Sequence, residues 1–234
     1  AWNSILPEYD PYKYGSFAVN AGHQVYRLTT EIQQRLAHPS TREQLDQFPP
    51  ILAFQSVDDA PVSAPTLIQG LFQKLPEAGH ELVLFDINRM AGIDSLMVSD
   101  PTSKIASILK APSRSFTVSL VTNQSAQTPE VECRRWQANN SKMKKDRLDL
   151  SWPEDVYSLS HISLPFAVSD PLYGSGEVSD GEVGYNLGNV ALRGERGVLR
   201  ISPADQLRLR WNPFYPYLEG RALRFIRERS SAAR

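Results

Sequence analysis

Residues 51–87, ILAFQSVDDAPVSAPTLIQGLFQKLPEAGHELVLFDI, carry the clearest secondary-structure pattern of this chain. The runs 51–56 and 81–87 are short and nearly continuously apolar, which is typical of strands buried on both faces of a parallel sheet. Between them, Ser63 and Pro65 predict the start of a helix. The apolar face of this predicted helix consists of Leu67, Ile68, Leu71, Phe72 and Leu75. Strand, helix and strand in this order indicate one βαβ crossover, so we expect a fold of the α/β class.

Further elements are expected on both sides of this unit. Asn20 is the predicted N-cap of a helix that ends near His38, with apolar residues at helical spacing. Other helices are expected near 101–110 and 217–229. Segments 115–123 and 130–138 alternate apolar with polar residues and predict an antiparallel hairpin. VALRG (190–194) and VLRIS (198–202) form a second strand-like pair.

A short basic run follows the predicted hairpin and contains Lys142, Lys144, Lys145 and Arg147. We interpret it as a solvated loop. The alternative interpretation is a contact with an anionic ligand or a membrane surface.

Composition excludes several classes of protein. Hydrophobic residues make up 41% of the chain and charged residues 22%, which is typical of a soluble protein. The net charge of −1 gives no basic footprint, so we expect no nucleic-acid partner. No apolar run approaches the roughly 20 residues that span a bilayer, so we expect no transmembrane segment. Cys133 is the single cysteine, which excludes an intrachain disulfide and mildly favours a cytoplasmic location.

An acid and a histidine stand out as candidate catalytic residues. Asp58 and Asp59 follow the strand predicted at 51–56, and His161 lies about a hundred residues later in VYSLSHISLPF (156–166). Acid before histidine is the second half of the order Ser…Asp…His. No Gly-x-Ser-x-Gly occurs in the 234 residues. We therefore expect the nucleophilic serine to lie upstream of this chain.

The chain resembles the α/β-hydrolase superfamily, and within it the lysophospholipase and monoacylglycerol-lipase-like (serine aminopeptidase-like) branch. The resemblance rests on PEYDPYKYGSF (7–17), FQSVDDAPVS (54–63), SLSHISLPFAVSDPLYG (158–174), ALRGERGVL (191–199) and RLRWNPFYPYL (208–218). It implies that Asp59 is the acid of the triad, with Asp58 as the alternative, and that His161 is the base. The oxyanion-hole residues of this branch lie upstream of the residues that carry the resemblance.

The resemblance also implies a domain organisation. We expect one incomplete α/β-hydrolase domain over residues 1–234, consisting of the last parallel strands with flanking helices and an inserted antiparallel hairpin. Its parts are a segment after the sixth strand or on the side of a cap (1–50), the βαβ unit with the acid (51–88), an insertion with the hairpin (89–150), and the histidine loop with the C-terminal region (151–234). Two buried parallel strands need further neighbours, which supports the expectation of a missing part.

The expected function is that of a serine hydrolase acting on a carboxylester, lysophospholipid or monoacylglycerol, with this chain inactive by itself. The partners are then a small ester or lipid substrate and the missing N-terminal half, which a second chain could supply. No cofactor is expected. His23, His38 and His80 lack the spacing of metal ligands, so no metal site is expected either. The alternative is a non-catalytic binding or interaction protein that kept the scaffold and lost its serine.

Overall fold

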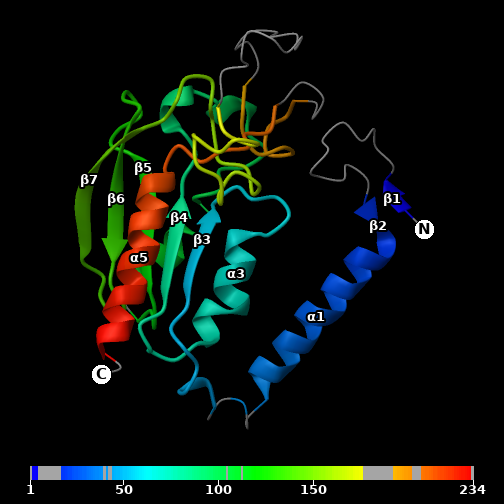
Figure 1. Cartoon of the computed structure of the whole chain (residues 1–234), viewed down its shortest axis with the longest axis vertical. Coiled ribbons are helices and arrows are strands. Elements are labelled where there is room, and N and C mark those ends of the chain that lie inside the picture. The colour runs from blue at the N-terminus through cyan, green and yellow to red at the C-terminus, as the bar shows by residue number, and fades with distance from the viewer. Residues whose placement is uncertain are drawn as a thin grey trace. The chain divides into compact units, whose positions relative to one another are not determined.

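The structure, a computed structural model, describes residues 2–4, 17–38, 41, 44–103, 105–111, 113–175, 192–201 and 207–232. The chain divides into two units, Ala1–Phe48 and Pro49–Arg234, which are described separately. The first unit contains the antiparallel strands β1 (Trp2–Ser4) and β2 (Phe17–Ala18), followed by helix α1 (Val19–Ala37) (Figure 1).

Helix α1 confirms the helix predicted from Asn20 to His38. The predicted N-cap is wrong, however, because Ala18 occupies that position and Asn20 lies inside the first turn. The side chain of Ala18 makes no capping hydrogen bond to the first turn of the helix. Strand β2 ends at Ala18, and α1 begins at the next residue.

The second unit is built on a mixed, open sheet of five strands. Along the sheet the order is β3 (Leu52–Ser56), β4 (Glu81–Phe85), β5 (Thr117–Asn123), β6 (Glu130–Trp136) and β7 (Met143–Ser151). β3, β4 and β5 are parallel, whereas β6 is antiparallel to both β5 and β7. The predicted α/β class, the two predicted parallel strands and the predicted hairpin are therefore confirmed.

The hairpin and β7 give the parallel strands the neighbours that the sequence left open. β5 pairs in parallel with β4, so the segment predicted as an insertion continues the sheet. Among the described residues β3 and β7 form its two edges.

Strand β7 corrects the interpretation of the basic run as a solvated loop. Lys144, Lys145 and Arg147 are exposed on this edge strand, while Leu148 and Leu150 pack against the core. Lysines on an edge strand oppose pairing with further strands. The strand was missed because its first half shows no alternation of apolar and polar residues.

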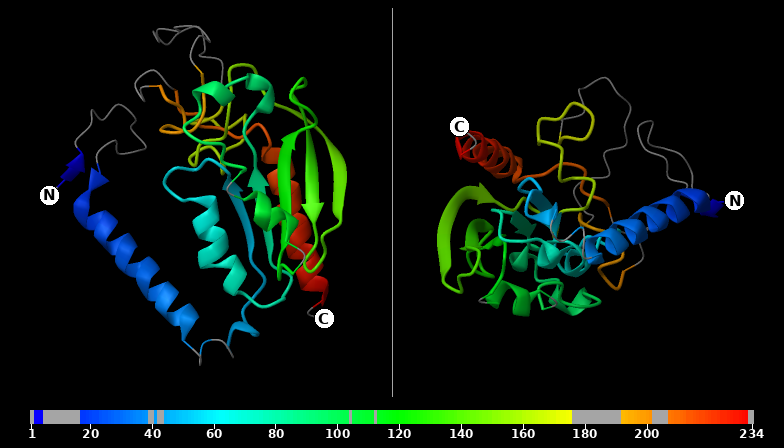
Figure 2. Two further views of the ribbon diagram at one scale, coloured as in Figure 1. Left: turned by 180° about the vertical axis from the view of Figure 1, so that it is seen from behind. Right: turned by 90° about the horizontal axis from the view of Figure 1, so that it is seen from below.

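Helices lie on both faces of the sheet, as Figure 2 shows for α5 (Tyr215–Ala232) and α3 (Ala64–Gly70). Helix α3 begins after Ser63 with a proline in its first turn, as predicted. It is shorter than predicted, because the chain leaves the helix at Leu71 and forms the 3₁₀ turn η1 (Phe72–Lys74). The remaining short elements are η2 (Arg89–Ala91), η3 (Asp94–Leu96) and α4 (Ala106–Lys110).

The helix expected near 101–110 is reduced to α4, whereas the final helix is confirmed by α5. The strand-like pair at 190–194 and 198–202 is not observed: within the described residues 192–201, Arg193 and Leu199 form only isolated bridges. Residues 190, 191 and 202 lie outside the described residues, as do residues 7–16 of the first motif. None of the described helices combines the length and the apolar character needed to cross a membrane.

The core on the α5 side of the sheet centres on Phe214, which is fully buried just before the helix. Its ring stacks on Phe85 of β4 at 6.0 Å and meets Trp152 edge-on at 4.7 Å. On the opposite face, Phe72 packs against Phe116 at 5.1 Å between ring centroids. Phe85 of β4 also stacks on Phe54 of β3 at 6.4 Å, so these contacts fix both strands, whose carboxyl ends lead into the loops that carry the candidate site.

Candidate functional site

Asp59 follows the carboxyl end of β3 and is held by two donors. The end of the strand is anchored because the Val57 backbone N donates to the Phe85 carbonyl at 2.9 Å. Oδ1 of Asp59 accepts from the Val62 backbone N at 2.9 Å, and Oδ2 accepts from Gln55 Nε2 at 2.7 Å. Only 8% of Asp59 is exposed. These two hydrogen bonds therefore fix the orientation of the Asp59 carboxylate without any contribution from His161 or Glu195.

His161 lies on the loop that leaves the β7 side of the sheet. This loop is tied to the carboxyl end of β4, because the Asn88 backbone N donates to the Tyr157 carbonyl at 2.7 Å and Asn88 Nδ2 donates to the Val156 carbonyl at 2.9 Å. A turn follows, in which the Ser163 backbone N donates to the Ser160 carbonyl. The side chain of His161 is 25% exposed, so one part of its ring remains accessible to solvent.

Glu195 brings a second carboxylate to the histidine. Its backbone N donates to Ser158 Oγ at 3.0 Å, and the preceding Gly194 donates to the Leu207 carbonyl. A Cβ on Gly194 would lie 2.4 Å from the Tyr157 ring, so this close approach requires glycine. Glu195 itself is only 1% exposed.

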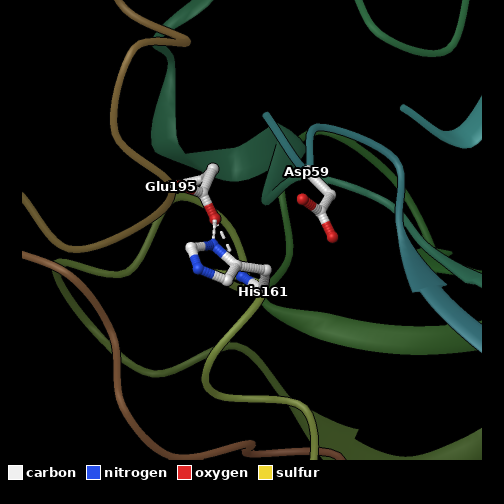
Figure 3. Close-up of side chains that lie close together, drawn as sticks. All are labelled: Asp59, His161 and Glu195. Carbon is white, nitrogen blue, oxygen red and sulfur yellow. Dashed lines mark hydrogen bonds and ion pairs between the residues drawn. The ribbon is translucent and has the colours of Figure 1, made fainter. Parts of the chain in front are cut away.

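The contact between His161 and Glu195 is the central interaction of the site (Figure 3). Oε2 of Glu195 accepts from the ring Nδ1 at 2.7 Å and from the His161 backbone N at 2.8 Å. Oε1 accepts from the Arg196 backbone N at 3.1 Å. With the Nδ1 proton directed at Glu195, Nε2 is the ring nitrogen left for proton transfer.

Asp59, His161 and Glu195 form one cluster. One side-chain ligand atom from each residue lies within 4.8 Å of the corresponding atoms of the other two. The structure thus places the predicted acid and the predicted base together, although the carboxylate bonded to Nδ1 is Glu195. Figure 3 shows Glu195 bonded to His161 and Asp59 nearby on a different segment.

Residue types of this kind also occur in sites for divalent cations. Here Nδ1 is already engaged by a short hydrogen bond to Glu195. This bond orients the ring equally well when Nε2 is a metal ligand and when it is a base. The order of acid and histidine in the chain favours the acid–base interpretation.

Sequence reasoning missed Glu195. The residue lies inside the motif ALRGERGVL, but its 34-residue separation from His161 is not a recognised spacing. The available signal was a single acid among arginines directly after a glycine, which is too general to mark a site.

Asp58, which precedes Asp59, and Glu195 have pKa values that are shifted in opposite directions. Burial raises the pKa of Asp58 to about 7, and the negative charge of Glu195 adds to this, against the opposing hydrogen bonds from Ser56 and Ser158. Burial also acts to raise the pKa of Glu195, but hydrogen bonds from the ring and backbone of His161 outweigh it and leave the pKa below its ordinary value. Glu195 is therefore a carboxylate at neutral pH, whereas Asp58 holds a proton in a large fraction of molecules.

A second polar cluster lies at the carboxyl ends of β4 and β5. Asp86 accepts from Arg89 and from Thr122 Oγ1, and Arg89 also donates to Asp100 and to Thr102. These groups satisfy one another, so we assign the cluster a structural role.

No family model, no curated protein and no solved structure matches this chain.

Proposed function

We propose that this chain is the C-terminal part of a serine hydrolase of the α/β-hydrolase type, which cleaves carboxylester bonds. The proposed substrates are lysophospholipids, monoacylglycerols or small carboxylesters. The nucleophilic serine and the oxyanion hole lie in a part of the enzyme outside these 234 residues, since no Gly-x-Ser-x-Gly occurs among them.

The observation that carries this proposal is the 2.7 Å hydrogen bond between His161 Nδ1 and Glu195 Oε2, with the carboxylate of Asp59 in the same cluster. A carboxylate on Nδ1 fixes the tautomer of a catalytic histidine and stabilises the imidazolium that forms during the reaction. The position after a parallel strand also supports the proposal, because ligands of open α/β sheets bind at the carboxyl ends of the strands.

In the proposed reaction, His161 Nε2 takes the proton of the serine hydroxyl as that oxygen attacks the ester carbonyl. The imidazolium then gives this proton to the departing alcohol, and an acyl-enzyme remains. A water molecule, deprotonated by the same Nε2, attacks the acyl carbonyl; the bond to the serine oxygen breaks, the imidazolium returns the proton to that oxygen, and the acid is released. Throughout the cycle Glu195 holds the Nδ1 proton.

The roles of the two carboxylates follow from their contacts. Glu195 is bonded directly to the ring and orients it. Asp59 occupies the position that the family resemblance assigns to the acid, and its fixed negative charge favours the imidazolium from a second direction. Both residues therefore belong to the proposed site.

One observation favours a second candidate function. The described site contains a base and acids but no serine nucleophile, which is also the arrangement expected of a binding protein that kept the scaffold. Such a protein would retain the fold and the histidine contact and would have no esterase activity.

The test is labelling of the full-length protein with a fluorophosphonate, followed by mapping of the modified peptide. We expect a labelled serine in a Gly-x-Ser-x-Gly peptide upstream of residue 1, and loss of labelling in the His161→Ala variant. His23→Ala, on the exposed side of α1, is the matched control and should label like the wild type. A folded protein that takes no label contradicts the hydrolase proposal and favours the binding protein.

A further inference from the structure

Asp58 is a buried acid next to the site that the proposed reaction does not use. It is 6% exposed and lies between the end of β3 and Asp59. Its Oδ1 lies 2.6 Å from the hydroxyl oxygen of Ser56, and the same hydroxyl lies 3.0 Å from the Leu159 carbonyl oxygen. Ser56 is itself fully buried, so water does not compete for these contacts.

The two contacts of the Ser56 hydroxyl bear on whether the Asp58 carboxyl group is protonated. A serine hydroxyl has one proton, and an ionised Asp58 and the Leu159 carbonyl would have to share it as two acceptors. With Asp58 protonated, the carboxyl group donates to Ser56, and the Ser56 proton is left for the Leu159 carbonyl, so both contacts become full hydrogen bonds. The two contacts therefore favour a neutral carboxyl group.

Both partners of the central contact depend on this group. Leu159 lies two residues before His161, so the bond from Ser56 ties the histidine loop to the end of β3. On the other side, Ser158 accepts the backbone N–H of Glu195, and its hydroxyl acts to lower the pKa of Asp58. Asp58 is thus connected through one serine to the loop of the base and through another to the loop of the acid.

We propose that Asp58 is a positioning residue: as a neutral carboxyl group it donates to Ser56, Ser56 holds the Leu159 carbonyl, and His161 is thereby kept opposite Glu195. Loss of this proton returns the Ser56 proton to Asp58, breaks the bond to Leu159 and places a second negative charge near Glu195. The contact between His161 and Glu195 then weakens.

The surroundings of Asp58 favour the neutral form. The charged or titratable groups that act on it or respond to it are Glu195 and Tyr157, with Asp59 adjacent in the chain. None of these is a cation, and burial raises the pKa of Asp58 to about 7. The release of this proton therefore falls within the physiological pH range.

Only the catalytic consequence of this inference rests on the proposed function, since the contacts exist whether or not the protein is a hydrolase. The first test is therefore a nuclear magnetic resonance titration of the full-length protein that follows the His161 Nδ1 proton from about pH 5 to about pH 9. We expect the wild-type resonance to shift or broaden with an inflection near the pKa of about 7 of Asp58.

Three variants and one control sharpen this test. Asp58→Asn keeps a donor for Ser56 and cannot ionise, so its His161 resonance should stay in the low-pH form of the wild type across the range. Asp58→Ala and Ser56→Ala both remove the relay and should lose or broaden the resonance at every pH. Asp149→Asn, on the exposed part of β7, should behave like the wild type.

The outcomes separate the two proposals. If Asp58→Asn loses the resonance as Asp58→Ala does, or if the wild-type inflection persists in Asp58→Asn, the positioning role of Asp58 is wrong. The wild-type titration alone also decides, because a resonance that is unchanged across the range overturns the proposal without any variant. If the variants and the control give the expected results in this titration but the protein takes no fluorophosphonate label, the role of Asp58 is retained and the hydrolase proposal is rejected.

Discussion

A single carboxylate oxygen of Glu195 accepts two hydrogen bonds from His161, one from the ring Nδ1 at 2.7 Å and one from the backbone N at 2.8 Å. The first bond sets the orientation of the ring, and the second sets the position of the backbone that carries it. A substitution at Glu195 therefore affects the histidine in two ways.

Glu195→Gln is expected to lower the rate of ester hydrolysis, or of fluorophosphonate labelling, by about a hundredfold or more, the range of a general acid–base contribution. The amide keeps an acceptor oxygen but removes the charge that stabilises the imidazolium. Asp59→Asn should cost less, because no hydrogen bond from the ring to Asp59 is present among the described contacts. Equal or reversed losses in the two variants would assign the orienting role to Asp59.

The stability of the protein is expected to fall as pH rises from about 4 to about 7 because of Asp58. Its pKa is raised from 3.8 to about 7, so in this window the folded state binds a proton that the unfolded state releases. At about 1.4 kcal/mol for each tenfold change in proton affinity, the penalty reaches roughly 4 kcal/mol above pH 7. Urea unfolding of the wild type and of Asp58→Asn at several pH values measures it, and the variant should lack this decline.

Glu195 has the opposite effect in a lower pH window. Because its pKa lies below the ordinary value of 4.5 in the folded protein, the unfolded state binds its proton first as pH falls. The stabilisation is present above pH 4.5 and is lost as pH falls through the folded-state pKa. Glu195→Gln should therefore flatten the acid limb of the unfolding curve, whereas Asp58→Asn should flatten the neutral limb. A variant that changes the other limb contradicts this assignment.

Removal of Glu81 is expected to destabilise the fold by about 3 kcal/mol or more. Glu81 begins β4 and accepts from Arg221 Nε of α5 at 2.7 Å and from Arg135 of β6 at 2.8 Å. The side chains of Glu81 and Arg221 are 3% and 5% exposed, so Glu81→Gln leaves a buried guanidinium without its main counter-charge. Thermal unfolding measures this loss.

The matched control for Glu81 is Asp146→Asn, which breaks the exposed pair with Lys144 at 3.2 Å. Its effect should stay within about 0.5 kcal/mol. A similar loss of stability in both variants would show that the buried contacts of Glu81 with Arg221 and Arg135 contribute no more than an exposed ion pair.

Phe214→Ala is expected to cost about 3–5 kcal/mol, the range for large-to-small changes of a buried aromatic residue. The ring is fully buried and contacts both Phe85 and Trp152. Ile226→Ala on α5, where the side chain is 60% exposed, should change stability by less than about 0.5 kcal/mol. Denaturant titration of both variants compares them directly, and a mild effect at Phe214 would mean that α5 is not anchored through this ring.

The parts of the fold that could be predicted are those in which local pattern and burial agree. The apolar run of β4 is buried throughout and that of β3 becomes buried at its carboxyl end, and the short loop between segments 115–123 and 130–138 agrees with the antiparallel pairing of β5 and β6. β7 could not be predicted from an alternating pattern. Lys144 and Lys145 are adjacent on this edge strand, and both of their side chains are exposed to solvent although they point to opposite faces of the sheet. The parallel pairing of β4 with β5 is a long-range choice that leaves no local signal.

The candidate site shows the same division. Asp59 and His161 are found from sequence because each lies in a recognisable motif, and the structure brings them into one cluster. Glu195 and Ser158 are not found, because their importance comes from contacts between loops that are distant in the chain. The proton on Asp58 depends on burial beside Ser56, which no residue pattern records.

The two edge strands of the sheet, β3 and β7, differ in the side chains that a further pairing strand would contact. The β7 edge carries the exposed charged residues Lys144, Lys145, Asp146, Arg147 and Asp149, which a pairing strand would have to desolvate. The β3 edge carries the half-buried Leu52 and Phe54 and, among the described residues, pairs only with β4. Self-association in concentrated solution should therefore begin at β3 and not at β7.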